Sequence, residues 1–179
     1  MEIREMNDGE IEAIRQLRLK SYIEYKKLVS QEHWEVLERT LISDNDLKSD
    51  VKIYVAEMDN VIVGSVVLFP ASVRAYDWSD SVQEYPEIRM LSVNPDIRGK
   101  GIGEALVDHC LEVSKKGNEQ YIGLHTASFM EKALSLYMKK GFERLPQRDL
   151  EPMNDGIIVK AFIMDLNKNT CKRKFNTCR

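Results

Sequence analysis

The residues best suited to chemistry lie in one stretch, from Glu87 to Gly103. An apolar segment, which predicts a strand, is followed by the run Arg98-Gly99-Lys100-Gly101-Ile102-Gly103. Pro95 cannot continue a central strand, so the strand should end near it. Beyond the glycines, four positions recur at spacings of four, three and four, which predicts one face of an amphipathic helix: Ile102, Leu106, His109 and Val113. The glycine-rich turn therefore precedes a helix.

A turn at a helix N-terminus favours anions. The first amides of a helix have no partner within it, and the aligned peptide dipoles add partial positive charge there. The glycines at 99, 101 and 103 permit unusual backbone angles and carry no side chain that would hold a phosphate away from the amides. Arg98 and Lys100 add positive charge. The turn is thus a candidate phosphate site, although a turn that only joins strand to helix fits the same letters.

Other phosphate-binding turns have different letters. A nucleoside-triphosphate loop needs Gly-x-x-x-x-Gly-Lys-Ser/Thr and a dinucleotide turn needs Gly-x-Gly-x-x-Gly, and neither pattern occurs here. The letters present are Arg98-x-x-Gly101-x-Gly103, preceded by Leu91-x-Val93-x-Pro95. This combination resembles the acetyl-CoA signature of the GCN5-related N-acetyltransferase (GNAT) superfamily.

A second signature lies downstream. Ala133-x-x-x-Tyr137-x-x-x-Gly141-Phe142 is similar to the family's pattern, and the resemblance covers roughly residues 2–166, most strongly 87–142. One position departs from the pattern: many relatives carry an Asn seven residues before the Tyr, where it contacts the pantetheine arm, and this chain has Met130. Backbone groups or water would have to replace that hydrogen bond.

The resemblance implies an α/β (α+β) fold. The expected GNAT fold is a mixed central sheet of about six to seven strands with about four helices on its two faces. Its fourth and fifth strands splay apart, and acetyl-CoA enters between them as a co-substrate.

The resemblance also implies roles for particular residues. Acetyl-CoA would be bound by the strand and turn residues and by the Tyr137 hydroxyl, which would protonate or hydrogen-bond the CoA sulfur. A strand amide near Leu91 would polarise the thioester carbonyl, and no metal is expected. The cofactor-binding residues would be Leu91, Ser92, Val93, Arg98, Gly99, Lys100, Gly101, Ile102, Gly103 and Tyr137.

Three alternatives stand for the base that takes the proton of the amine. Glu87 begins the central strand, where many relatives place an acid that acts directly or through water, and partial burial would raise its pKa toward the working range. His125 ends the fifth predicted strand, and its ordinary pKa of about 6.5 suits the task. Alternatively, the amine arrives neutral and water is sufficient.

The elements that position these residues are predicted from periodicity. A short edge strand over 2–6 precedes a helix capped by Asp8 that runs to about residue 27, and Ser30 caps a second helix. Further predicted strands cover 52–57, 61–69, 120–125 and 156–166, with a tight turn at Asp59-Asn60. A Ser-x-x-Glu capping box at Ser128 should start the helix that Gly141 ends.

The acceptor should lie between the first two helices and the long 71–85 loop. The candidate wall residues are Tyr22, Tyr25, Trp34, Arg74, Tyr76 and Trp78. Aromatic residues at helical spacing are also typical of a hydrophobic core, so core packing is the alternative interpretation of these positions. They do not distinguish a polyamine, an amino acid, an aminoglycoside or a protein terminus.

Composition indicates a soluble globular protein. At 179 residues, 43% hydrophobic and 31% charged, the chain fits one domain, expected over 1–166. Five of the 26 basic residues lie in the last twelve positions and all 29 acids precede them, so residues 1–167 carry a net charge of −8. That charge argues against nucleic acid and suits a cationic acceptor. No apolar run approaches a membrane span, so a cytoplasmic location is the default expectation.

The remaining features predict little chemistry. Cys110 should be a buried hydrophobe, and no disulfide or metal site is assigned to the three cysteines. The 167–179 tail is polar, basic and aperiodic, which is typical of disorder.

The preferred hypothesis is an N-acetyltransferase, a transferase of the acyltransferase class, that moves an acetyl group from acetyl-CoA to a primary amine of a small molecule within a ternary complex. Acetylation of a protein N-terminus or lysine is the alternative within the enzyme class, and a non-catalytic CoA-binding sensor is the alternative outside it. Nucleic acid and membrane partners are not expected, and a homodimer is left open.

Overall fold

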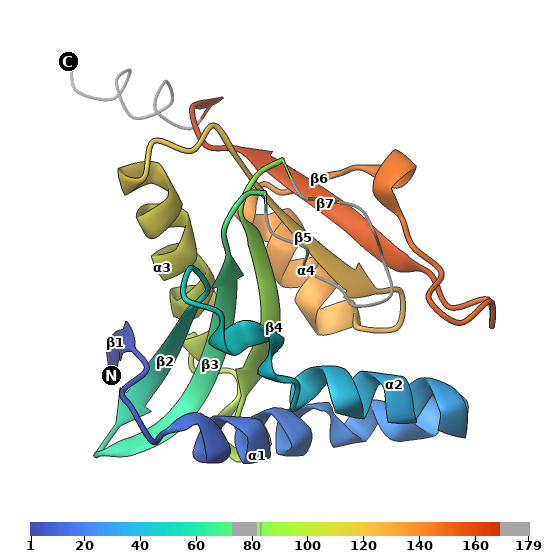
Figure 1. The fold of residues 1–179 in the computed structure, drawn as a ribbon, viewed down its shortest axis with the longest axis horizontal. Helices are drawn as coiled ribbons and strands as arrows, with labels where there is room; N and C mark the ends of the chain where they lie inside the picture. The colour runs from blue at the N-terminus through green and yellow to red at the C-terminus, as the bar shows by residue number, and fades with distance from the viewer. Residues whose placement is uncertain (73–81, 83, 169–179) are drawn as a thin grey trace. The chain divides into compact units, whose positions relative to one another are not determined.

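The computed structural model describes residues 1–72, 82 and 84–168 of the chain (Figure 1). Two compact units are present. The first contains Met1–Pro70 and Ile88–Cys110, and the second contains the described parts of Ala71–Glu87 and Leu111–Arg179. The described residues carry seven strands and four α-helices in the predicted chain order, which agrees with the expected six to seven strands and about four helices.

The strands of the first unit run in the order β1-β2-β3-β4 (Figure 1). Both β1–β2 and β2–β3 pair antiparallel. The β2–β3 pair was expected, because two runs of β-branched residues flank a tight turn. Asp59 and Asn60 form that turn with φ of 51° and 61°, values that short polar side chains tolerate. The strands are β1 Glu2–Glu5, β2 Lys52–Met58, β3 Val61–Phe69 and β4 Glu87–Val93.

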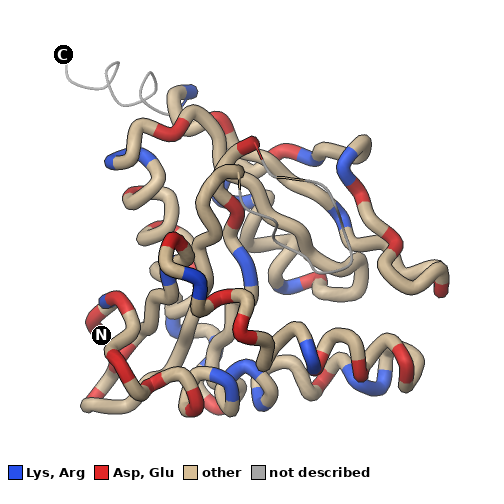
Figure 2. The backbone as a smooth tube through the Cα atoms, viewed as in Figure 1, with Lys and Arg blue, Asp and Glu red and all other residues tan. Residues whose placement is uncertain are grey.

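The first helical segment is shorter than predicted. Helix α1 (Ile11–Tyr22) gives way to a 3₁₀ helix, Ile23–Leu28, and its N-cap is Glu10 rather than Asp8. Helix α2 (Gln31–Leu41) begins as predicted, because the Ser30 hydroxyl accepts a hydrogen bond from the His33 amide at 3.1 Å. Acidic and basic residues are interspersed along the outer faces of both helices (Figure 2).

Helix α3 (Ile102–Lys116) follows the glycine-rich turn. Ile102 and Leu106 are buried, as the periodicity predicted, and they pack against β3 at Gly64. A methyl group at Gly64 would come within 2.9 Å of the Ile102 side chain and 3.2 Å of the Ser92 carbonyl oxygen. The bare backbone at Gly64 therefore sets how closely α3 approaches the strands.

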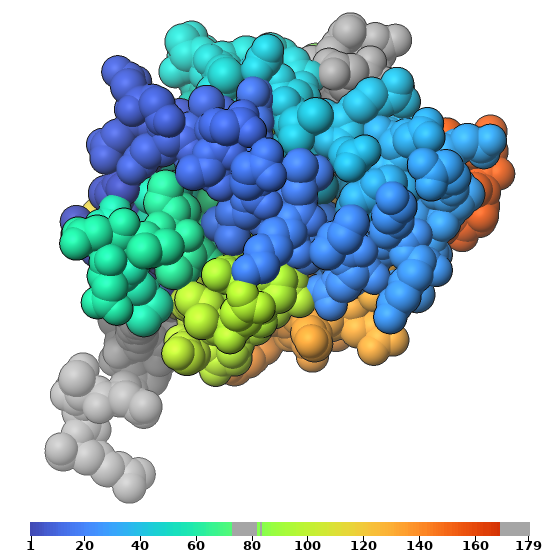
Figure 3. Space-filling model, turned by 90° about the horizontal axis from the view of Figure 1, so that it is seen from below, coloured from blue at the N-terminus to red at the C-terminus, as the bar shows by residue number. Residues whose placement is uncertain are grey.

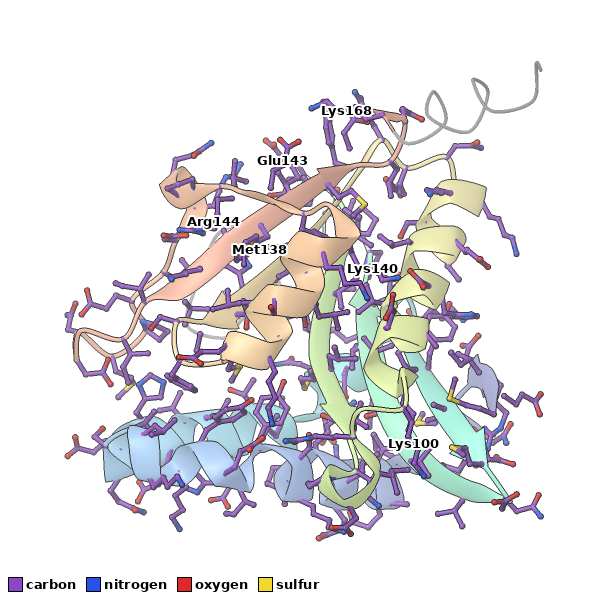
Figure 4. The ribbon with its side chains drawn as sticks, turned by 180° about the vertical axis from the view of Figure 1, so that it is seen from behind. Lys100, Met138, Lys140, Glu143, Arg144 and Lys168 are labelled. Atoms are coloured by element: carbon purple, nitrogen blue, oxygen red, sulfur yellow. The ribbon has the colours of Figure 1, made fainter. Side chains whose placement is uncertain are left out.

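The second unit contains three strands in the order β5-β7-β6, all paired antiparallel. Helix α4 packs against their sheet (Figure 4). Gly141 ends α4 with φ of 95°, as predicted. The elements are β5 Tyr121–Ala127, α4 Glu131–Lys140, β6 Glu143–Arg144, a 3₁₀ helix Pro146–Arg148 and β7 Val159–Asp165.

Two local predictions in this unit are wrong. Ser128 does not cap α4: the N-cap is Met130 with no side-chain hydrogen bond, and the Ser128 amide pairs with the Ile158 carbonyl. The last strand begins at Val159 rather than at 156. Val159 also forms a β-bridge with Leu150. The local pattern predicted neither position correctly.

Several sequence predictions fall outside the described residues, namely Arg74, Tyr76, Trp78 and the tail beyond 168. Cys110 is buried, as predicted, and desolvation raises the pKa of its thiol to about 12. Among the described residues, no group of three or more His, Cys, Asp or Glu side chains is placed to hold a metal ion. Within the same ranges, no helix has the length and apolar character needed to cross a membrane.

Candidate functional site

The glycine-rich turn has the geometry of a phosphate cradle. Gly99 and Gly101 adopt φ of 82° and 77°, and a Cβ built on either would meet no atom within 4 Å. Helix α3 begins at Ile102, directly after them, so its first amides face this open turn. Gly103 lies inside α3. Lys100 extends from the turn (Figure 4).

Arg98 binds the end of α1. Its guanidinium donates to the Ser21 carbonyl at 2.7 Å and to the Ser21 hydroxyl at 3.2 Å, and it forms an ion pair with Glu24. Lys20 pairs with Asp96 on the same segment, which packs beside α1 (Figure 3). Arg98 thus fastens the turn to α1 and the following 3₁₀ helix.

The same end of α1 also meets β4. The Val93 amide donates to the Ser21 hydroxyl at 3.3 Å, and the Tyr22 hydroxyl donates to the Leu91 carbonyl at 3.3 Å. A pantetheine arm that paired with Leu91 and Val93 would have to break these two long hydrogen bonds and replace them with its own. The structure therefore brings the predicted strand and turn residues together around Ser21.

Strand β4 is irregular at Met90. This residue has φ of 49°, a strained value for an unbranched side chain inside a strand. Such a kink re-aims the next peptide group, which carries the Leu91 amide. The Ser92 hydroxyl is buried and donates to the Met90 carbonyl at 3.1 Å, so it supports the kink. Nothing in the letters around Met90 signals this geometry.

Glu87 and His125 form a buried pair in the second unit. His125 Nδ1 lies 2.8 Å from Glu87 Oε1, and the two side chains are 6% and 1% exposed. His125 Nε2 lies 3.1 Å from the Arg148 carbonyl oxygen. The two residues proposed as rival bases from the sequence are therefore partners.

These contacts orient the imidazole. A carbonyl oxygen only accepts, so a hydrogen bond to Arg148 is donated by His125 Nε2. The short contact between Nδ1 and Glu87 Oε1 then joins the other side of the ring to the carboxyl group.

Tyr85 was not among the residues singled out from the sequence. Its ring lies over Gly123 of β5, where an added Cβ would come within 2.3 Å of it. Burial raises the pKa of Tyr85, and Arg148, Glu87 and Glu84 act on it electrostatically. The Gly123 amide donates to the Pro86 carbonyl at 2.8 Å, which holds the segment before Glu87 against β5. A glycine in an otherwise apolar strand was the available signal.

Tyr137 lies on α4 and is 5% exposed. Its ring meets Phe142 edge-on at a centroid distance of 5.9 Å, so both aromatic positions of the second signature contribute to packing. The Thr126 hydroxyl donates to the Met130 sulfur at 3.6 Å. Met130 is the residue that stands where many relatives have Asn.

The described aromatic residues of the predicted acceptor wall have different environments. Trp34 is 1% exposed and belongs to the core of the first unit. Tyr22 and Tyr25 meet edge-on at 6.0 Å, and desolvation raises the pKa of Tyr22 to about 12. Tyr22 reaches β4 through its hydroxyl, and Tyr25 lies beside Tyr22.

Sequence comparison points to one family. Residues 11–142 match the sequence profile of the Acetyltransferase (GNAT) family. The chain is 33% identical over 69 residues to an uncharacterized N-acetyltransferase of Methanocaldococcus jannaschii, a match that covers 37% of this chain. It spans only 30% of that relative's length.

Solved structures give the same fold. An acetyltransferase of the GNAT family from Staphylococcus aureus Mu50 superimposes with a TM-score of 0.66 at 21% identity, covering 92% of this chain and 98% of that one. The PaiA N-acetyltransferase from Thermoplasma acidophilum, solved in complex with coenzyme A, gives 0.62 at 18% identity, covering 89% and 96%. These matches confirm the fold predicted from the sequence.

Proposed function

Since this chain belongs to the acetyltransferase (GNAT) family, we propose that it transfers an acetyl group from acetyl-CoA directly to a primary amine of a small molecule within a ternary complex. The reaction forms a C–N bond and breaks the C–S bond of the thioester. The amine must lose a proton, and the departing sulfur must be stabilised or gain one.

The 98–103 turn is the proposed site for the pyrophosphate of acetyl-CoA. The open geometry at Gly99 and Gly101 and the start of α3 support this assignment. Acetyl-CoA supplies the activated acetyl group when bound. The Leu91 amide, re-aimed by the kink at Met90, is the proposed donor to the oxygen on which negative charge develops.

The Glu87–His125 pair is the proposed proton acceptor. A group can take the proton of the amine only in its deprotonated form, which a higher pH favours. The rate should therefore rise with pH as the pair loses its proton. Glu87 is almost fully buried and His125 slightly less so, which favours a route through a water molecule.

Tyr137 is the proposed group for the leaving sulfur. A phenol of pKa about 10 is a weaker acid than a thiol of about 8.5, so a hydrogen bond that stabilises the thiolate is sufficient. The observation that carries catalysis, rather than binding alone, is the buried Glu87–His125 pair. A module that only binds CoA has no use for a proton-accepting pair at the start of β4.

The direct test is thiol release from acetyl-CoA by the purified chain against a panel of polyamines, amino acids, aminoglycosides and peptides with free N-termini or lysines. We expect acceptor-dependent release with a small-molecule amine, and mass spectrometry should show one added acetyl group. Release only with peptides would move the assignment to protein acetylation. Tight acetyl-CoA binding without release from any acceptor would support the sensor instead.

A further inference from the structure

The segment between β6 and β7 makes the carbonyl contact to His125, and one ion pair fixes that segment. Arg144 ends β6, and Asp149 lies five residues later within the segment. The two side chains bind each other through two parallel hydrogen bonds of 2.8 and 2.7 Å. A two-point guanidinium–carboxylate pair fixes geometry as well as charge. Arg148, which supplies the carbonyl, precedes Asp149 directly.

The same ion pair is tied to β7. Asp149 Oδ1 accepts from the Ala161 amide at 2.8 Å, and Arg144 donates to the Ala161 carbonyl at 2.6 Å. The Arg144 guanidinium also stacks over Phe162 at 5.0 Å. Ala161 is the register partner of His125 in the adjacent strand β5. The ion pair is thus hydrogen-bonded to Ala161, the cross-strand neighbour of His125.

We propose that Arg144 and Asp149 are positioning residues for the Glu87–His125 pair. They hold the 145–149 segment so that the Arg148 carbonyl keeps a hydrogen on His125 Nε2, which leaves Nδ1 in contact with Glu87. The proposal rests on the proposed function, because it gives His125 a role in proton transfer. Neither residue touches the substrate.

The electrostatic surroundings make the effect measurable. The hydrogen bond from Arg144 holds the pKa of Asp149 below its usual value of 3.8, so the ion pair stays charged near neutral pH. A changed pH profile between pH 6 and 9 in variants of this pair therefore does not come from titration of the pair itself. The other titratable groups acting in this region are Tyr85, Glu84 and Arg148.

The neighbouring residue Glu143 offers a matched control. It precedes Arg144 on β6 and pairs with Lys168 at 3.7 Å, with both side chains largely exposed (Figure 4). Glu143→Gln and Asp149→Asn each remove one negative charge without changing side-chain size. Only the second disturbs the segment that contacts His125.

The test combines kinetics with ¹⁵N NMR of the imidazole nitrogens, His125 being assigned among the three histidines by His125→Ala. We expect Asp149→Asn to remove the Nε2–H signature and to shift the pH–rate profile. It should lower kcat about tenfold while KM for acetyl-CoA changes less than about twofold. Glu143→Gln should match the wild type, and Arg144→Lys should restore part of the rate lost in Arg144→Gln.

Unchanged His125 nitrogen shifts and an unchanged pH profile in both Asp149→Asn and Arg144→Gln would overturn the proposal, whatever happens to the melting temperature. If Asp149→Asn does not fold, Arg144→Gln decides by the same two readouts. A wild-type chain that acetylates no acceptor contradicts the proposed function, and the NMR comparison then still decides whether the ion pair positions His125.

Discussion

At the scale of single residues, the contact between Glu87 and His125 is central to the proposed chemistry. The carboxyl group and the imidazole are in contact, and both side chains are almost closed to solvent. The sequence singled out both residues as separate candidates. Their contact spans 38 positions in the chain and depends on side-chain packing, which periodicity does not encode.

Removing the carboxylate should change how activity depends on pH. In Glu87→Gln, the glutamine side-chain amide can donate a hydrogen bond to Nδ1 of a neutral imidazole, so no proton has to leave before catalysis. The negative charge that attracts the proton of the amine is lost. We expect kcat to fall about 10²-fold and the rising limb of the pH–rate profile to flatten. His125→Ala should show the same loss of the limb. A rising limb that survives in both variants contradicts the assignment.

The Tyr137 hydroxyl should affect turnover and not affinity. Tyr137→Phe keeps the ring that packs on Phe142, so the fold should be retained. We expect kcat to fall at least about tenfold, with the Kd of acetyl-CoA nearly unchanged. Steady-state kinetics and calorimetric titration measure the two quantities. An unaltered kcat would remove Tyr137 from the chemistry and leave it as a core aromatic.

At the scale of elements, the path from β4 through the turn into α3 was largely predictable. Proline ends strands, glycines adopt positive φ and helical spacing is local, so the turn followed from the residues. The kink at Met90 and the hydrogen bonds between β4 and the end of α1, where Ser21 accepts and Tyr22 donates, were not, because they arise from packing between distant elements.

The turn can be tested with a glycine pair of equal strain. Gly101 and Gly9 both have positive φ, 77° and 87°, and a Cβ at either meets no atom within 4 Å. Alanine at each should cost about 1–2 kcal/mol of stability for the same backbone reason. We expect only Gly101→Ala to weaken acetyl-CoA binding, at least about tenfold, because its methyl intrudes on the phosphate. Equal Kd values for the two variants would argue against the turn as the phosphate site.

The N-terminal strand is held by a charge cluster with a defined pH range. Arg4 donates two hydrogen bonds to Glu10, at 2.9 and 2.7 Å, and also pairs with Glu57 of β2. The Arg4 hydrogen bond is the main reason that the pKa of Glu10 falls from 4.5 to about 2. A lowered pKa stabilises the folded state above pH 4.5, and this contribution is lost as the pH falls toward 2.

Glu10→Gln should therefore lower the free energy of unfolding at neutral pH. Urea titrations across pH 2 to 7 should show the difference from the wild type shrinking below pH 4.5 and disappearing near pH 2. Lys52→Met, which removes an exposed pair with Glu5, is a control expected to change little. A constant difference at every pH would show that Glu10 acts through packing alone.

At the scale of the whole molecule, the family profile shows that the chain belongs to the GNAT family, and the solved structures show the fold. We expect residues outside the two signatures to select the acceptor. Arg74, Tyr76 and Trp78 lie outside the described residues, and Trp34 proved to be core. Tyr22 and Tyr25 are the described aromatics from which acceptor selectivity should be explored.

The central claim is that the 98–103 turn holds the pyrophosphate of acetyl-CoA while the thioester reaches the Leu91 amide. A crystal structure of the chain with acetyl-CoA tests it most directly. The account predicts pyrophosphate oxygens within hydrogen-bonding distance of the turn amides, and the thioester oxygen near the Leu91 amide. A pyrophosphate bound elsewhere, with the turn amides free of it, would contradict the account.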